Sequence, residues 1–180
     1  MTIIIQSRRR SLANIQADFP DAKIIDVTSK GEQPWVKFSP FYPHGQIPVP
    51  FYPHLKSQSV EGVWQGLKIF KTAGIDRAKM QVTDMKNIKR TQRKYGDCLG
   101  HKAGDRLLTY LEARKLIYLP TYLWVLENSL ATLVGQLQEL SQSEPIVLLD
   151  YETNGEIENT RKPLSHAWLI KLYIEGNYPN

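Results

Sequence analysis

The chain has 180 residues, of which 42% are hydrophobic and 23% are charged, a composition typical of a globular protein and not of a disordered one. Its single cysteine, Cys98, excludes an intrachain disulfide and a cysteine-rich zinc cluster, and the four histidines lack metal-ligand spacing. No segment has the length and flanking charges of a signal peptide or membrane span. We therefore expect a cytoplasmic protein that uses neither membrane, metal nor cofactor.

The net charge of +5 is concentrated in one block, residues 77–106. This block contains nine Lys or Arg and three Asp, so it carries the whole positive excess. Such a block attracts the phosphates of a nucleotide or of a nucleic acid. A solvated helical face explains the same pattern equally well.

In chain order, two short β-branched runs come first, Ile3–Ile5 and Lys23–Val27, and both are predicted strands. Between them a helix is expected over Ser11–Phe19, capped by its first residue and stopped by the proline that follows. A third strand is expected over Trp35–Phe38. Residues 39–56 contain five prolines, which favours an irregular loop, and four aromatic residues, which we expect to pack on the core or to line a pocket.

A helix is predicted over Ser59–Phe70, because its apolar residues recur at the spacing of one buried face. Its polar residues form a second stripe at i, i+4 and i+7: Glu61, Gln65 and Lys68. Gly62 and Gly66 form a third side, where another backbone could approach closely.

The second half of the chain predicts four helices and one strand. They are a basic helix over Lys86–Lys94, a helix over Asp105–Leu119 ended by Pro120, a leucine-rich helix capped by Thr121, a buried strand over Ile146–Leu149 and a helix over Ser165–Glu175. The fold class that follows is α+β: one helix-rich domain over residues 1–180 with a small β-sheet.

Two segments together resemble the NADAR family of N-glycosidases, which includes riboflavin-intermediate glycosidases and ADP-ribosyl hydrolases. They are the aromatic-proline loop around Phe38–Tyr42 and the helix that follows it. The positions in register with the family's helix pattern are Ser59, Glu61, Trp64, Gln65, Gly66, Lys68 and Ile69. The sequence departs from the family at Pro40, where the family has Asn, and in lacking its late Trp-Gly segment.

The resemblance implies an N-glycosidase that acts on a phosphorylated ribosyl or ADP-ribosyl compound, with Glu61 as the catalytic carboxylate. The chemistry suits these residues, because an oxocarbenium-like sugar needs a carboxylate, its phosphate needs cations and the base needs aromatic walls. Glu61 can equally serve the dipole of its own helix. The expected substrate-binding residues are Phe41, Tyr42, Gln65, Lys68, Lys89, Arg90, Arg93, His101, Asp150, Glu152, Asn154 and His166.

Several of these assignments leave alternatives open. Asp150, Glu152 and Asn154 follow a buried strand, where site residues often emerge, but strand ends are also ordinary turns. His166 at a helix start can contact phosphate or belong to the cap. The rival function is a non-catalytic module that binds a nucleotide or nucleic acid through residues 77–106. The oligomeric state and the identity of the substrate do not follow from the sequence.

Overall fold

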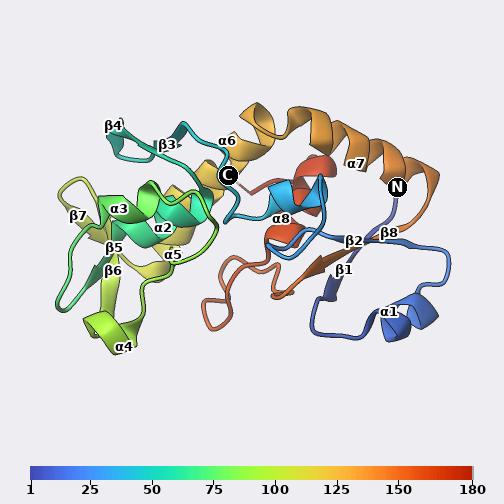
Figure 1. Ribbon diagram of the computed structural model, residues 1–180, viewed down its shortest axis with the longest axis horizontal. Helices are drawn as coiled ribbons and strands as arrows, with labels where there is room; N and C mark the ends of the chain where they lie inside the picture. The colour runs from blue at the N-terminus through green and yellow to red at the C-terminus, as the bar shows by residue number, and fades with distance from the viewer. Residues whose placement is uncertain (180) are drawn as a thin grey trace. The chain divides into compact units, whose positions relative to one another are not determined.

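The computed structural model describes residues 1–179 and has an α+β fold, as expected (Figure 1). The chain divides into two compact units. Unit 1 comprises Met1–Ser39 and Leu130–Pro179, and unit 2 comprises residues 40–129. The expectation of a single domain over residues 1–180 stays a prediction, and each unit is described by itself.

Unit 1 is built on a three-stranded parallel sheet of order β1-β8-β2. The strands are β1 (Ile3–Ser7), β2 (Lys23–Asp26) and β8 (Ile146–Asp150), and Leu148 pairs with Ile5 on one side and Ile25 on the other. Every residue of β8 is buried, because neighbouring strands flank it on both sides and helices cover both faces. All three strands confirm the sequence prediction.

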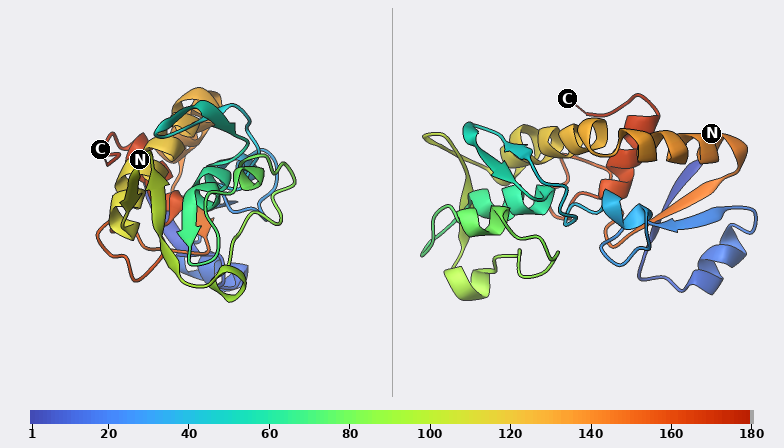
Figure 2. Two further views of the ribbon diagram at one scale, coloured as in Figure 1. Left: turned by 90° about the vertical axis from the view of Figure 1, so that its left-hand side faces the viewer. Right: turned by 45° about the horizontal axis from the view of Figure 1, so that its top comes forward.

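Three helices cover this sheet: α1 (Leu12–Asp18), α7 (Ala131–Ser143) and α8 (His166–Ile174). Ile15 of α1 packs on Val147 and Leu149, while α7 and α8 lie on the opposite side (Figures 1 and 2). Because side chains alternate across a strand, the last residue of β8 faces the side of α8. The serine cap predicted at position 11 is confirmed by a hydrogen bond from the Asn14 amide, and Ser165 caps α8 in the same way through the Trp168 amide.

The third strand expected in unit 1 is wrong. Trp35–Phe38 forms the 3₁₀ helix η1, in which the amides of Val36, Lys37 and Ser39 donate to carbonyls three or four residues earlier. These local bonds replace strand pairing, so the aromatic and β-branched content of the segment reflects its burial. The expected leucine-rich helix is likewise two helices, with Ser129 and Leu130 between them.

Unit 2 contains α2 (Val60–Leu67) packed against the short α3 (Arg77–Met80). Ser59 caps α2 by accepting a hydrogen bond from the Gly62 amide at 3.0 Å. A Cβ atom at Gly62 would lie 2.9 Å from the Lys79 carbonyl oxygen, and one at Gly66 would lie 2.7 Å from the Met80 methyl carbon. The glycine side of α2 is therefore the close packing surface that its sequence predicted.

Two small antiparallel sheets complete unit 2, and both correct the sequence prediction. The loop expected over residues 39–56 contains a hairpin of β3 (Ile47–Val49) and β4 (Tyr52–Ser57). Each strand of this two-stranded sheet has one unpaired edge, so a proline, which has no backbone N–H to donate, is tolerated in it. The helix expected to reach Phe70 ends at Leu67, because Lys68 adopts an extended conformation and begins β5 (Lys68–Phe70).

The second sheet has the order β5-β6-β7, with β6 (Cys98–Ala103) in the centre and β7 (Arg106–Leu108) at its edge. It takes the place of the first part of the helix expected over Asp105–Leu119. The basic helix is also wrong in extent, since only α4 (Gln92–Tyr95) forms. The basic block follows a loop and strands here, so its charges do not lie on one helical face.

A continuous helical run follows β7: α5 (Tyr110–Ala113), the π-helix η2 (Arg114–Tyr118) and α6 (Leu119–Asn128). Pro120 does not end it, because proline is tolerated in the first turn of α6 and the wider π turn precedes it. Thr121 is inside α6, where its hydroxyl donates to the Ile117 carbonyl, so it is not the predicted N-cap. Among residues 1–179, no helix is long and apolar enough to cross a membrane.

Candidate functional site

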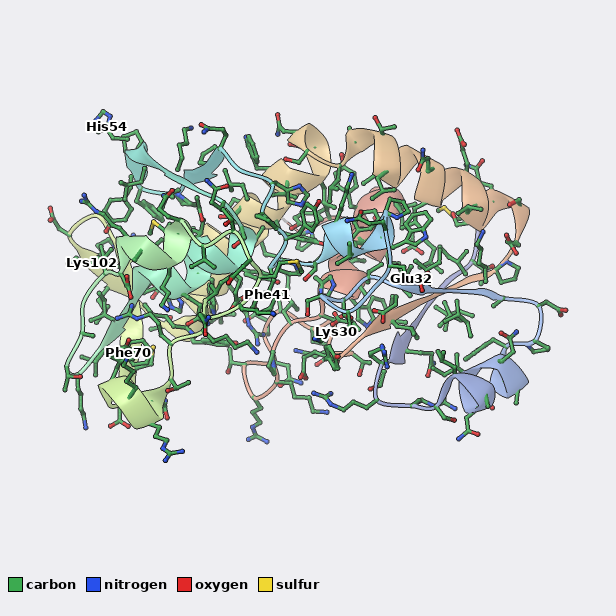
Figure 3. The ribbon with its side chains drawn as sticks, in the orientation of Figure 1. Lys30, Glu32, Phe41, His54, Phe70 and Lys102 are labelled. Carbon is green, nitrogen blue, oxygen red and sulfur yellow. The ribbon has the colours of Figure 1, made fainter. Side chains whose placement is uncertain are left out.

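Unit 2 contains a cavity of about 360 Å³ beside the sheet β5-β6-β7. Strands β5 and β6 supply most of its wall, and α4, α5 and the segment before α4 supply the rest. The residues that line it are Lys68, Phe70, Arg90, Gln92, Cys98, Leu99, Gly100, His101 and Tyr110. Phe70, labelled in Figure 3, extends from β5 toward Tyr95 of α4, and the two ring centroids are 5.6 Å apart.

Strand pairing brings together two of the side chains that line this cavity. Lys68 on β5 and His101 on β6 are direct partners in the antiparallel register. Residues paired in this way have Cβ atoms about 5 Å apart on the same face of the sheet. A pairing between residues 33 positions apart in the sequence therefore places an ammonium group beside an imidazole.

The His101 side chain is buried, with 1% of the residue exposed. Neither of its ring nitrogens makes a hydrogen bond of good geometry among residues 1–179, and the Trp64 backbone is the polar group that acts on the ring. The ring packs on the Trp64 ring with centroids 3.8 Å apart. Burial, and then the charge of Lys68, lower the pKa of His101 to about 3, and the Trp64 backbone opposes only part of this shift. His101 is thus a neutral imidazole that forms part of the cavity wall, with both ring nitrogens buried beneath its surface.

Lys68 is half-buried, and its Nζ atom lies 5.9 Å from the centroid of the Trp64 ring. No described residue makes a hydrogen bond or an ion pair with this ammonium group. Burial lowers the pKa of Lys68, and the charge of Glu61 opposes the shift. The cation is therefore held in a partly apolar place without an anionic partner within hydrogen-bonding distance.

Arg90 also lines the cavity, but its guanidinium group is engaged in structure. Nη1 donates to the carbonyl oxygens of Gln65 at 3.2 Å and Lys68 at 2.8 Å, and Nη2 donates to that of Gly74 at 2.8 Å. The group also lies 4.9 Å from the ring centroid of Phe70. Only 5% of the residue is exposed. Arg90 thus holds the end of α2 and the start of β5, and a role as a mobile phosphate contact would break these bonds.

Glu61 and Gln65 are one turn apart on α2 and hydrogen-bonded to each other. Gln65 Nε2 donates to Glu61 Oε1 at 2.8 Å, and the Arg90 amide donates to Gln65 Oε1 at 2.9 Å. Glu61 is 9% exposed. Neither side chain lines the 360 Å³ cavity, whereas Lys68, the third member of the predicted polar stripe, does. The turn of the chain at Lys68, from helix into strand, separates the three.

The other site residues predicted in unit 2 do not line this cavity. Lys89 and Arg93 are exposed, and Lys89 Nζ is 5.4 Å from the ring centroid of Phe41 (labelled in Figure 3). Tyr42 is half-buried and packs on His44, with ring centroids 4.9 Å apart. These side chains form surface contacts of their own.

The four remaining predicted residues belong to unit 1. His166 Nδ1 is 2.9 Å from Asp150 Oδ2, and His166 Nε2 is 2.9 Å from the Val27 carbonyl oxygen. Since both partners accept, both ring nitrogens donate and the imidazole is protonated. The hydroxyl of Ser165 donates to the same Asp150 carboxylate at 2.8 Å and makes no hydrogen bond to the His166 ring.

The pKa values of this pair follow from the same contacts. Burial alone would lower the pKa of His166, but the charge and hydrogen bond of Asp150, with the Val27 carbonyl, raise it. Burial alone would raise the pKa of Asp150, but His166, Ser165 and the Ala167 amide lower it. The pair is a buried ion pair that joins β8 to α8 and to the segment after β2.

Glu152 and Asn154 also have local partners. Glu152 forms an ion pair with Arg9 at 3.2 Å. The Asn154 amide donates to the carbonyl oxygens of Glu156, Asn159 and Lys162, so it organises the loop after β8. These contacts agree with the alternative that the residues after β8 form an ordinary turn.

Sequence reasoning missed six residues of the cavity wall: Phe70, Gln92, Cys98, Leu99, Gly100 and Tyr110. The usable signal was the run from Cys98 to Ala103 between two glycines, which is typical of a strand of a hairpin. Gly100 has φ +146°, and a Cβ atom there would lie 2.3 Å from the Leu108 carbonyl oxygen. The close approach of β6 and β7 therefore requires glycine at this position.

Residues 1–179 include no group of three or more His, Cys, Asp or Glu side chains placed to hold a metal ion.

The model of a protein family described as a family of unknown function (DUF6939) matches residues 7–170, and the chain belongs to this family. No match was found among curated proteins. The resemblance to NADAR is wrong: the matching family model spans the whole of residues 38–70, and no NADAR domain is detected.

The residues that suggested the resemblance have local structural causes. Ser59 caps α2, Gly66 packs on Met80, and Trp64 packs on His101. A capped helix that packs closely on its neighbours uses residues of these types. Five of the seven matched positions lie in α2 or cap it and two lie in β5, so the match reflects local structure and not the family.

Proposed function

We propose that unit 2 binds a small anion of the phosphorylated ribosyl or nucleotide class in the cavity lined by Lys68 and His101. One observation carries the proposal: the ammonium group of Lys68, without an ion-pair partner among the described residues, lines this cavity beside a buried imidazole. Buried polar groups are ordinarily satisfied, and an anion would satisfy the ammonium group.

The cavity wall suits such a ligand. The ammonium of Lys68 pairs with a phosphate or carboxylate and gains more from the contact because it is partly desolvated. The ring of His101 adds an uncharged part of the wall. The rings of Phe70 and Tyr110 supply apolar wall.

The surrounding charge supports an anionic ligand. Lys86, Lys89, Arg93 and Lys94 are exposed on the same unit and are four of the nine basic residues of the basic block. Exposed charges of one sign raise the local concentration of an oppositely charged ligand. A cytoplasmic location stays a prediction from the sequence.

Calorimetry with ribose 5-phosphate, ADP-ribose and a single-stranded oligonucleotide tests the proposal. We expect Lys68→Met to weaken binding of the small phosphates about 10- to 100-fold, the value of a charge-assisted hydrogen bond. Lys56→Met is the matched control, because Lys56 is exposed on β4 of the same unit, and its affinity should be unchanged. Unchanged affinity in Lys68→Met refutes the proposed site. Binding of the oligonucleotide alone, with a steep salt dependence, supports a nucleic-acid module instead.

A second candidate is N-glycoside hydrolysis with Glu61 as the carboxylate that stabilises an oxocarbenium ion. It is favoured by the hydrogen bond from Gln65, which fixes this carboxylate, and by the charge that Glu61 exerts on Lys68. Release of the free base from nucleotide and ADP-ribosyl substrates is the assay. Glu61→Gln should reduce turnover by about two to four orders of magnitude and leave binding within a few fold. Turnover equal to that of the wild type in a folded Glu61→Gln protein would remove Glu61 from the reaction.

A further inference from the structure

We infer that Lys68 Nζ is a nucleophile, which forms a Schiff base with the aldehyde of an open-chain phosphorylated sugar bound in the unit 2 cavity. The inference rests on the proposed function and adds a substrate class, an aldehyde, together with a covalent step.

The position of Lys68 meets the requirements of an imine-forming lysine. Its side chain lines a cavity large enough for a small sugar phosphate, and aromatic rings flank it at Trp64 and Phe70. Lysines that react with carbonyl compounds are desolvated in apolar pockets or lie beside other cations, because both conditions favour the neutral amine. Lys68 meets the first condition, since burial is the largest cause that lowers its pKa; Lys89 and Arg90 act in the same direction, and Glu61 and Cys98 oppose them.

The other lysines of unit 2 differ in their surroundings. Lys71 forms an ion pair with Asp97 at 2.6 Å, Lys79 donates to the Asn87 carbonyl, and Lys102 donates to the Asp105 carbonyl at 3.3 Å. Among the half-buried lysines of unit 2, Lys68 is thus distinguished by its lack of a hydrogen-bond partner and by the cavity in front of it.

The step balances with the groups that Lys68 and the aldehyde bring. The neutral amine of Lys68 attacks the aldehyde carbon, an N–C bond forms, and a proton passes from the new ammonium nitrogen to the carbonyl oxygen to give a carbinolamine. Loss of that hydroxyl as water, with loss of the remaining amine proton, gives the C=N bond. The overall change is amine plus aldehyde to imine plus water.

Reductive trapping tests this step. The protein is incubated with ribose 5-phosphate and sodium cyanoborohydride, and the adduct is located by intact mass and peptide mapping. Ribitol 5-phosphate, which has the same chain and phosphate but no carbonyl group, serves as the competitor and as the ligand for calorimetry. We expect one adduct, on Lys68, formed about tenfold faster than on any exposed lysine and suppressed by ribitol 5-phosphate.

Two variants control the chemistry. Lys68→Arg keeps the charge but has no amine that forms an imine, so the selective adduct should disappear. Lys56→Arg, in an exposed lysine of β4, should leave it unchanged. Selective adduct formation that survives Lys68→Arg, or labelling spread evenly over the lysines, overturns the inference.

The failure of this inference differs from the failure of the proposed function. If ribitol 5-phosphate binds in a manner that depends on Lys68, but no selective adduct forms, the Schiff base is wrong and the anion site stands. If neither ribitol 5-phosphate nor ribose 5-phosphate binds, the anion site is wrong and the covalent step is overturned with it.

Discussion

Replacement of His166 by Gln removes the positive half of the buried ion pair in unit 1. The two side chains are 9% and 6% exposed, so solvent cannot compensate the Asp150 carboxylate that remains. Removing one partner of a buried pair costs about 3–5 kcal/mol of unfolding free energy. One amide hydrogen bond from Gln returns about 1 kcal/mol. We therefore expect a net loss of about 2–4 kcal/mol, or about 5–10 °C in Tm for a chain of this length.

The loss should depend on pH, and the direction follows from the two pKa shifts. The pKa of His166 is raised in the folded state, so its contribution is complete below its unfolded pKa of about 6.5 and is lost as pH rises through the folded value. The pKa of Asp150 is lowered, so its contribution is complete above its unfolded pKa of about 3.9 and is lost as pH falls through the folded value. Both contributions are complete between about pH 4 and 6.5.

The assay is urea denaturation of wild type and His166→Gln at about pH 6 and about pH 9. The difference between the two proteins should be largest at the lower pH and should narrow as the wild type loses its imidazolium. His54→Gln is the control, because His54 is exposed on β4 (labelled in Figure 3), and it should change stability by no more than about 0.5 kcal/mol. A loss below about 1 kcal/mol at pH 6, or a difference that does not change with pH, would refute the charged pair.

Two further predictions concern unit 2. Arg90→Met should lower the unfolding free energy by about 3–4 kcal/mol, because three carbonyl oxygens lose their donor. The control, Arg93→Met at an exposed position, should have little effect, and equal losses in the two variants on denaturation would show that the Arg90 hydrogen bonds contribute nothing. Gly100→Ala should lower the unfolding free energy by more than about 2 kcal/mol, since its Cβ would lie 2.3 Å from the Leu108 carbonyl oxygen. Gly104→Ala, with open space around it, should cost about 1 kcal/mol, and similar melting temperatures for the two variants would contradict this geometry.

The sequence by itself determined those elements whose causes are local. The apolar run of β8 reads as a strand because both its faces and both its edges are covered. Ser11, the predicted cap of α1, accepts a hydrogen bond from the helix backbone through its own side chain, which needs no distant partner. The glycine side of α2 also followed from spacing alone.

Only the tertiary structure decided the site. Lys68 continues the helical periodicity of α2, but it turns into β5 because β6, about 30 residues later, offers hydrogen-bond partners that no local pattern shows. The same pairing places His101 beside Lys68. Charge patterning suggested that Arg90 binds phosphate, yet burial turns it into a donor to three backbone carbonyls. Burial and strand pairing depend on which distant segments meet, so spacing within one segment could not predict them.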